Sequence, residues 1–368
     1  MDSLAQELID TVIGNVIKSS LLSCSLVSRR WRRKSQQRAF DTISFSSEDK
    51  VNRWCTDISQ DSDGISSYVR HVRIRKIFSW NEPVLLGRML RTLSSLTELS
   101  LFQTKIPDEF PGHILRGEFG KGITTLYLGF LGGAPPTTTS MILSLPDLKE
   151  LGVENYGVTP PEEPPPTYSA TLQRGPLNSL KLYGDIGGIG EALAKSRFTS
   201  RRLSLSVRTP GVEQLLILSS ETVVELKLRG VWLCRFSDRA ETIVTNLPDN
   251  SSAGTPPLIH LPSLPALTTL VFYTDAVDPS PHLTNILCSI GSAPVLTSIT
   301  IKFDGWRVIG ALPKGYRWAD VDGWLSQIAK HAEVTGGLLL TLTQWLEGMP
   351  AREELFPRFR EAGGIIKL

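Results

Sequence analysis

Apolar and polar residues alternate along most of the chain in one short, recurring pattern. An apolar residue is followed by two others and then by apolar-x-apolar, as in Leu96-Thr97-Glu98-Leu99-Ser100-Leu101. Alternation with a period of two predicts a strand with one buried face. Copies of this hexad occur at 69–74, 96–101, 123–128, 148–153, 177–182, 200–205, 223–228, 267–272 and 296–301.

The spacing of the hexads is close to that of leucine-rich repeats. Their last apolar residues lie at 74, 101, 128, 153, 182, 205, 228, 272 and 301, in successive steps of 27, 27, 25, 29, 23, 23, 44 and 29 residues. The hexad resembles the LxxLxL core of these repeats, whose period is about 20 to 29 residues, although the asparagine that usually follows the strand is absent from 99–104 and from 226–231. The longest step contains a Pro-, Ser- and Asn-rich stretch, interpreted as a surface insertion at 247–262, and a Pro-rich loop is expected at 159–167.

Between the strands the apolar period shifts to that of a helix, most clearly at 84–93, 212–218 and 283–290. This alternation predicts an α/β fold, an irregular leucine-rich-repeat solenoid with a curved parallel sheet and helices on its outer side. A doubly wound sheet alternates the same elements and is the competing architecture. Nine copies of one hexad favour the solenoid. In the tail, helices at 321–328 and 353–359 and a strand at 338–342 are expected to close the open end of the sheet.

The first forty residues carry a different, helical pattern. Their first apolar stripe consists of Leu4, Leu8, Ile9, Val12, Ile13, Val16 and Ile17. After the polar step at 18–20, a second apolar segment contains Leu21, Leu22, Leu26 and Val27 and leads to a basic stretch around Trp31. Three short helices cannot bury so much apolar surface among themselves, which implies a partner surface.

The order of these parts resembles the F-box, particularly as it occurs in a large fungal (basidiomycete-type) family. The resemblance lies in residues 4–9 (LAQELI), Ile13, residues 24–31 (CSLVSRRW) and Phe40. In that family the segment binds the adaptor subunit of an SCF-type cullin–RING ubiquitin ligase, so the resemblance implies the adaptor and, through it, cullin as partners. It implies an adaptor-binding set of Leu4, Glu7, Leu8, Ile9, Ile13, Val16, Leu22, Leu26, Val27 and Trp31, some of which are internal core instead. Ala5 stands where the family usually has proline, and the link between the first two helices is short.

Two alternatives concern this segment. An amphipathic hairpin could dock its stripe on the chain's own repeats, as such helices often do, but the Trp31-centred pattern favours the F-box. A basic cluster surrounds this tryptophan and consists of Arg29, Arg30, Arg32, Arg33, Lys34 and Arg38. It is interpreted as a solvated helix face and not as a nuclear-localisation or nucleic-acid patch, because no basic stripe continues downstream.

In a solenoid, the residues between the buried positions of each strand project from the concave face, where repeat proteins usually bind partners. Mixed charge and a few tyrosines suit a protein target better than nucleic acid, while ordinary solvated sheet is the alternative. The candidate substrate-binding residues are Arg73, Arg75, Glu98, Tyr127, Glu150, Lys181, Tyr183, Arg202, Lys227, Arg229, Tyr273 and Lys302.

Composition adds few constraints. The chain has 368 residues, 41% of them hydrophobic, and a net charge of +2, which excludes a polyanion binder defined by overall charge. The four cysteines are scattered singly, so neither a zinc site nor a disulfide framework is indicated, and a cytoplasmic or nuclear location is expected. No metal, cofactor or membrane partner is expected. The expected domains are an F-box at 1–45 and a repeat domain at 46–368.

The sequence offers little support for catalysis. None of the five histidines shares a short motif with a nucleophile, and the glycines at 187–190 lack the spacing of a phosphate loop because Ala194 precedes Lys195. The leading hypothesis is therefore a non-catalytic receptor that brings a substrate to a ubiquitin ligase. The alternatives are a repeat scaffold with a degenerate F-box and no ligase role, and an enzyme that would reveal itself by a deep pocket with titratable groups.

Overall fold

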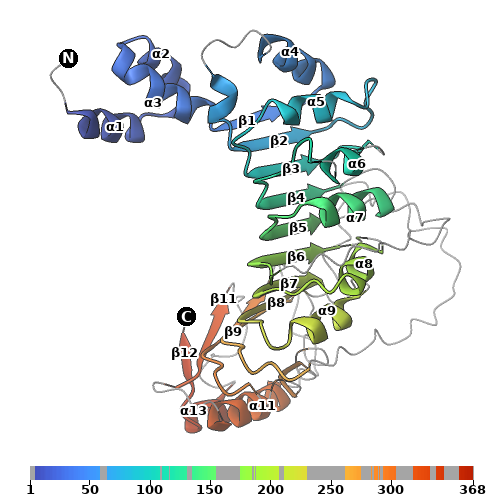
Figure 1. The fold of residues 1–368 in the computed structure, drawn as a ribbon. Helices are drawn as coiled ribbons and strands as arrows, with labels where there is room; N and C mark the ends of the chain where they lie inside the picture. The colour runs from blue at the N-terminus through green and yellow to red at the C-terminus, as the bar shows by residue number, and fades with distance from the viewer. Residues whose placement is uncertain are drawn as a thin grey trace, which may run out of the picture. The chain divides into compact units, whose positions relative to one another are not determined.

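After three helices at the N-terminus, the described chain from residue 42 onward consists of strands with helices between many of them (Figure 1). The computed structural model describes residues 5–58, 64–107, 110–115, 117–130, 135–154, 175–184, 186, 188–206, 211–229, 262–274, 283, 286–288, 290, 293–303, 318–331, 337–343 and 356–367. Contacts divide the chain into two compact units, Met1–Leu172 and Gln173–Leu368. The N-terminal helices thus share a unit with the first strands, whereas a domain boundary was expected after residue 45.

The N-terminal module, residues 5–40, is helical. Its elements are α1 (Gln6–Asn15), the 3-10 turn η1 (Lys18–Ser20), α2 (Leu21–Ser25) and α3 (Arg29–Phe40). Helices α1 and α2 both pack on α3. The module has a small core of its own in Ile9, Ile13 and Leu21, which are at most 1% exposed. Of the predicted stripe, Leu8, Ile9, Val12 and Ile13 lie on α1, whereas Val16 and Ile17 follow it in extended backbone and Leu4 lies outside the described residues. The polar step at 18–20 forms the 3-10 turn.

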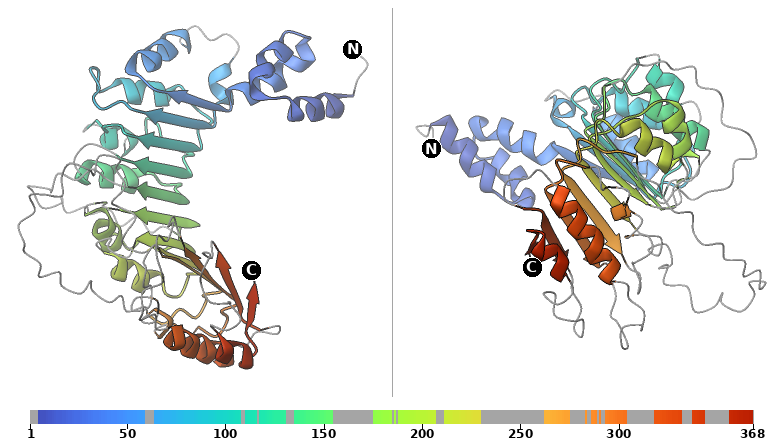
Figure 2. Two further views of the ribbon diagram at one scale, coloured as in Figure 1. Left: turned by 180° about the vertical axis from the view of Figure 1, so that it is seen from behind. Right: turned by 90° about the horizontal axis from the view of Figure 1, so that it is seen from below.

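The remainder of the first unit is a parallel sheet with helices. Its strands are β1 (Thr42–Phe45), β2 (His71–Arg75), β3 (Glu98–Phe102), β4 (Thr125–Gly129) and β5 (Glu150–Glu154). Its helices are α4 (Glu48–Ile58), η2 (Ile65–Tyr68), α5 (Leu85–Arg91), α6 (Phe110–Leu115) and α7 (Pro135–Ser144). Each strand pairs with the next one along the chain. Figures 1 and 2 show α5, α6 and α7 on one face of this sheet, and we call the opposite face the open face.

A recurring hydrogen-bond pattern fixes the register between repeats. The carbonyl oxygen of Arg70 accepts the N–H groups of Thr97 and Glu98 at 2.9 and 3.0 Å, and the Thr97 oxygen accepts those of the next repeat in the same way. The hydroxyls of Thr97 and Thr124 donate to these same carbonyl oxygens, at 3.2 and 3.3 Å. A threonine before the strand thus adds side-chain hydrogen bonds between repeats that lack the usual asparagine after it.

The second unit repeats this plan. Its strands are β6 (Ser179–Tyr183), β7 (Arg202–Ser206), β8 (Glu225–Arg229), β9 (Thr269–Thr274), β10 (Ser298–Phe303), β11 (Leu339–Thr343) and β12 (Ile365–Lys367). Its helices are α8 (Ile189–Lys195), α9 (Val212–Ser219), α11 (Trp318–His331) and α13 (Pro357–Glu361). The strands again pair in parallel and in chain order. The buried carboxylate of Asp322 accepts the N–H groups of Arg358 and Phe359 at 3.1 and 2.9 Å, which joins α11 to α13.

All nine hexads predicted from the sequence are strands, β2 to β10. Alternate residues are buried, as at Val72 and Ile74, whereas Arg73 between them is exposed. The α/β class and the parallel sheet are confirmed. Within each unit the strand order follows the chain order, which excludes the doubly wound alternative because that topology reverses its strand order midway. Parallel strands in chain order, with helices between many of them, are consistent with a leucine-rich-repeat solenoid-like fold.

Two elements at the start of the sheet were missed. Strand β1 pairs with β2, so the sheet begins within the range assigned to the F-box, and α4 follows it as the first helix of the repeats. Strand β1 has four residues and two apolar side chains, Ile43 and Phe45, too few to display a period. The expected Pro-rich loop at 159–167 and residues 247–261 of the expected insertion lie outside the described residues.

Candidate protein-interaction surfaces

Helix α1 carries two adjacent apolar rows. Ile9 and Ile13, one turn apart, point into the module and are 1% and 0% exposed. Leu8 and Val12 form the neighbouring row, about 100° around the helix, and are 55% and 47% exposed. The apolar stripe is therefore wider than the internal core requires.

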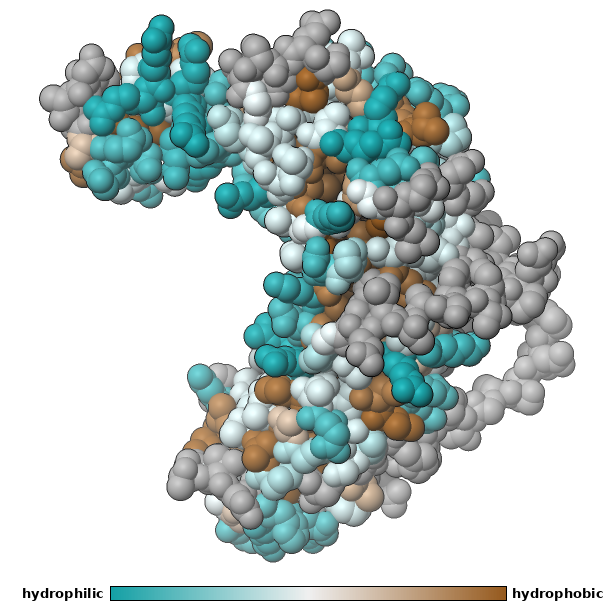
Figure 3. Space-filling model, in the orientation of Figure 1, coloured by the Kyte–Doolittle hydropathy of each residue, from teal (hydrophilic) through white to brown (hydrophobic). Residues whose placement is uncertain are grey.

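Helix α2 repeats this arrangement. Leu21 and Ser25 are buried, whereas Leu22 and Leu26, again one turn apart, are 54% and 80% exposed. Val27 follows at 49%, and Figure 3 shows hydrophobic surface on the outside of the module. The alternative in which the stripe is covered by the chain's own repeats is therefore wrong for these outward rows.

The predicted adaptor-binding residues divide into two groups. Ile9 and Ile13 are internal core, and Val16 and Trp31 pack against that core. Leu4 lies outside the described residues. The exposed members of the set are Glu7, Leu8, Leu22, Leu26 and Val27. The exposed Val12 and Ile17 were not in the predicted set, although both belong to the same stripe in the sequence.

Trp31 organises the module from within. It is half-buried against the Ile9–Ile13–Leu21 core, and its indole Nε1 is buried without a hydrogen-bond partner in the described part of the chain. The tryptophan that identified the motif is therefore mainly a packing residue.

The basic cluster of α3 has a structural role that the sequence did not reveal. Arg38 Nη1 donates to the carbonyl oxygens of Ile13 and Val16, the second at 2.8 Å. These carbonyls lie at the C-terminal end of α1, where a helix leaves acceptors unsatisfied and its dipole favours a cation. Lys34 Nζ lies 3.8 Å from Asp10 on the same helix α1. Arg38 therefore fixes the short link between the first two helices.

We expect Arg38→Ala to destabilise the module by about 1 kcal/mol, because it removes two charge-assisted hydrogen bonds at a partly exposed site. Arg38→Lys should recover part of this. Hydrogen exchange of the backbone at 9–16 measures the effect, with Arg33→Ala on the exposed side of the same helix as control. Equal exchange in both alanine variants would contradict the proposed link.

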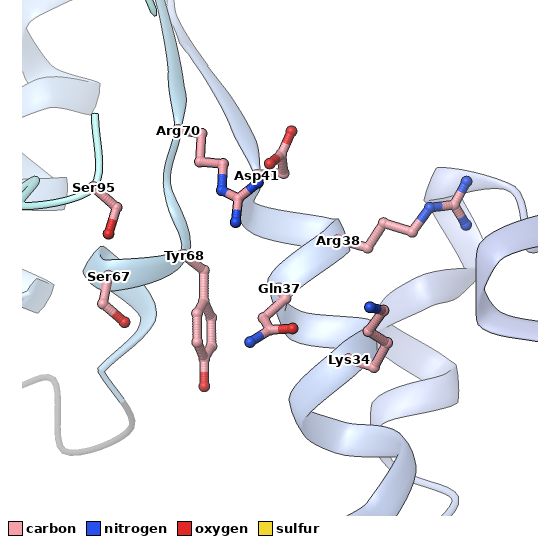
Figure 4. Close-up of a pocket in the computed structure, with 8 residues that line it drawn as sticks. All are labelled: Lys34, Gln37, Arg38, Asp41, Ser67, Tyr68, Arg70 and Ser95. Atoms are coloured by element: carbon pink, nitrogen blue, oxygen red, sulfur yellow. The ribbon is translucent and has the colours of Figure 1, made fainter. Parts of the chain in front are cut away.

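A polar pocket lies where the module meets the first repeats (Figure 4). It has a volume of about 240 Å³ and is lined by Lys34, Gln37, Arg38, Asp41, Ser67, Tyr68, Arg70 and Ser95. In Figure 4, Gln37 faces Tyr68 and Arg70 lies beside Asp41, whereas Arg38 points away from the tyrosine. The pocket thus carries both positive and negative side chains, and Arg38 points away from Tyr68. Its lining therefore favours no single class of ligand.

The open face of the first unit centres on Tyr127. Its register partners are Ser100 and Gly152, and its ring covers the glycine so closely that a Cβ there would lie 2.6 Å from it. The pKa of the Tyr127 phenol is raised, first by burial and then by the carboxylates of Glu150 and Glu98. The structure therefore brings three predicted substrate-binding residues together, while Arg73 and Arg75 are exposed on β2.

In the second unit, we call the face of the sheet opposite α8 and α9 the open face. It holds the other seven predicted residues. All are exposed or half-buried: Lys181, Tyr183, Arg202, Lys227, Arg229, Tyr273 and Lys302. Glu225 joins them, with its carboxylate 2.6 Å from Lys227 Nζ and 3.7 Å from Arg202 Nε. Arg229 lies on the rings of Tyr183 and Tyr273. At equivalent strand positions, the first unit thus carries a tyrosine between two glutamates, whereas the second unit carries mainly lysine, arginine and tyrosine.

Within the described residues, no three His, Cys, Asp or Glu side chains gather as metal ligands would. Burial raises the pKa of the Cys55 thiol, whereas an activated cysteine nucleophile has a lowered pKa.

A second pocket lies between α8 and α9. It has a volume of about 490 Å³ and is lined by Glu191, Ala194, Lys195, Gly211, Gln214, Ile217 and Leu218. None of the described helices combines the length and apolar character that crossing a bilayer requires.

Comparisons with known proteins add one finding. No protein-family model matches the chain, and no curated protein matches it. Among solved structures, the chain is similar to the leucine-rich repeat-containing protein LegL7 from Legionella pneumophila, with 12% identity and a TM-score of 0.41 over 84% of this chain and 88% of that one. The strand pairing of this chain itself shows parallel strands in chain order within each unit.

Proposed function

We propose that this protein is a non-catalytic substrate receptor of an SCF-type cullin–RING ubiquitin ligase. The N-terminal module would bind the adaptor subunit, and the open face of the sheet would bind a target protein. The observation that carries the proposal is the pair of outward apolar rows on α1 and α2, in a segment whose sequence resembles the F-box. Catalysis would belong to other subunits, and this chain would contribute proximity.

Exposed apolar side chains are concentrated in the module. Among the described residues, thirteen large hydrophobic side chains are exposed, and six of them lie between residues 8 and 27. Single exposed apolar residues are ordinary, but a cluster of them on a soluble protein marks an interaction site. Side chains one turn apart on two short helices suit a partner that offers a hydrophobic groove.

The departures from the family pattern leave the backbone intact. Ala5 has φ −60° and ψ 145°, which a proline could also adopt, and its carbonyl oxygen accepts the N–H groups of Leu8 and Ile9 at 3.1 and 3.2 Å. The short link after α1 is fixed by Arg38. Both features are compatible with adaptor binding, and a binding measurement with the adaptor separates the receptor from a scaffold with a degenerate F-box.

Calorimetric titration of the full chain with the purified adaptor subunit tests the proposal. We expect wild type to bind, and the double variant Leu8→Asp with Leu26→Asp to bind at least about 100-fold more weakly, because aromatic and aliphatic anchors dominate such interfaces. Ile217→Asp is the matched control, since this side chain is 59% exposed on α9 in the second unit. The proposal fails if wild type does not bind or if the double variant binds like wild type. The first of these results would favour the scaffold.

A further inference from the structure

Four side chains on the open face of the second unit form one connected stack. The guanidinium carbon of Arg229 lies 4.2 Å from the ring centre of Tyr183 and 4.8 Å from that of Tyr273. Lys302 Nζ lies 5.3 Å from the ring centre of Tyr273. The stack crosses strands β6 to β10, and Arg229, Tyr273 and Lys302 are direct register partners on β8, β9 and β10.

Small residues make this stack possible. Strand β7 places Ser204 and Ser206 on the open face between β6 and β8, which leaves room for Arg229 to reach Tyr183. The hydroxyls of Tyr183 and Ser204 are hydrogen-bonded to each other. The rings thus hold two cations in fixed positions without neutralising them, and cation–π contacts of this kind contribute about 0.5 to 2 kcal/mol each.

The two cations have no acidic partner in the part of the chain that the structure describes. The ion pairs described on this face join Glu225 to Lys227 and to Arg202, and none involves Arg229 or Lys302. Nε of Arg229 is buried and has no hydrogen-bond partner among the described residues. An arginine held by rings in place of a carboxylate keeps its capacity to bind an anion from outside the chain.

Charge differs between the described strands of the two units, although the whole chain carries a net charge of only +2. Among the described strand residues of the second unit, Glu225 is the single acid. The basic residues of those strands are Lys181, Arg202, Lys227, Arg229, Lys302 and Lys367. The strands β2 to β5 of the first unit instead carry Arg73, Arg75, Glu98, Glu150 and Glu154. Positive charge is therefore in excess on the described strands of the second unit and not on those of the first.

We propose that this face binds an extended acidic segment of the target protein, whose carboxylate or phosphate groups contact Arg229 and Lys302. The proposal deepens the target-binding half of the receptor function. Strands lie about 4.8 Å apart, so β6 to β10 span roughly 19 Å, which about six extended residues would cross. A peptide of about ten residues is thus long enough to engage the whole stack.

The occupied rings argue against nucleic acid. Proteins that bind single strands offer aromatic faces on which bases stack. Here Arg229 already lies over the rings of Tyr183 and Tyr273, and Lys302 lies over the ring of Tyr273 as well. An anionic peptide needs only the cations, whose positions these contacts set.

Fluorescence anisotropy with the full chain tests this proposal. The probes are labelled ten-residue peptides of alternating Gly with Glu, with phosphoserine or with Lys, and an oligouridine of similar charge. We expect the two acidic peptides to bind, the lysine peptide not to bind, and added salt to weaken binding. Comparing the Glu and phosphoserine probes shows which anion is preferred. An oligouridine that binds more tightly than both acidic peptides would overturn the proposal, as would acidic peptides that fail to bind.

Paired variants locate the site. Arg229→Gln with Lys302→Gln should weaken acidic-peptide binding at least about tenfold, equivalent to about 1.4 kcal/mol. Lys330→Gln with Arg360→Gln makes the same charge change at exposed residues of the helices α11 and α13 and should leave binding unchanged. Equal losses in both pairs would overturn the assignment. The single variant Lys302→Gln retains the contacts of Arg229 with both tyrosines and should lose part of the peptide binding. It tests the site even if the double variant does not fold. Leu8→Asp with Leu26→Asp should bind peptide normally, so failure of adaptor binding and failure of peptide binding are separately visible.

Discussion

Aspartate at Ile13 is expected to unfold the N-terminal module, whereas aspartate at Leu8 should leave it folded. Ile13 is 0% exposed in a core of three residues, so a carboxylate there would be buried without a partner. The cost should exceed about 4 kcal/mol, more than so small a core can tolerate. Leu8 is 55% exposed on the adjacent row, and a charge there remains solvated. Both variants should lose adaptor binding, for different reasons.

Hydrogen exchange on the full-length variants separates the two reasons. In Ile13→Asp, backbone amides of α1 and α3 should exchange rapidly while those of β6 to β10 stay protected, since these strands have their own buried residues, including Leu203, Leu226 and Leu270. In Leu8→Asp the whole pattern should match wild type. Rapid exchange in both variants would mean that the outward row also stabilises the module, and it would remove the distinction on which the adaptor proposal rests.

The second large effect is expected at Gly211, where α9 approaches α8. Its φ is +81°, and an added Cβ would lie 2.6 Å from the backbone atoms Gly190 C and Glu191 N. Gly211→Ala therefore combines an unfavourable backbone conformation with a collision against atoms that cannot rotate away. We expect a loss of about 3 kcal/mol or more and, for a unit of this size, a Tm lower by roughly 6 to 12 °C.

Gly188→Ala is the matched control for Gly211→Ala. Gly188 precedes α8, has φ −76°, and has nothing within 4 Å of an added Cβ. Its Tm should stay within about 3 °C of wild type, because its stability should change by less than about 1 kcal/mol. Differential scanning calorimetry measures both variants. Similar Tm values for the two would contradict the close packing of α8 against α9 at Gly211.

The strands were predictable because the repeat pattern reports burial directly. At 99, 101, 126 and 128 the sequence places leucines in alternation, and each is at most 1% exposed. Strand β1 was not predictable, because its four residues are too few to display an alternation. The threonine before a strand, such as Thr97, is visible in the sequence. Its hydroxyl donates a hydrogen bond to the carbonyl oxygen of Arg70, 27 positions earlier, and this contact could not be predicted from local sequence.

The adaptor-binding surface was predictable as a region but not residue by residue. Ile9 and Leu8 are chemically similar and adjacent in one stripe, yet only Ile9 is inside. The direction of each side chain depends on how α1 is rotated against α3, which contacts such as that of Arg38 help to determine. A helical stripe gives the apolar positions and leaves open how many of them a partner covers.

By itself, the sequence determined the periodic body, the parallel α/β class and the helical N-terminal segment, because each depends on local alternation of apolar and polar residues. Tertiary structure alone decided which apolar residues remain outside and which charged residues become neighbours. Arg229 and Tyr183 are 46 positions apart and meet across β7, which places Ser204 and Ser206 between them. Such meetings depend on register and strand order, which arise only when the repeats stack.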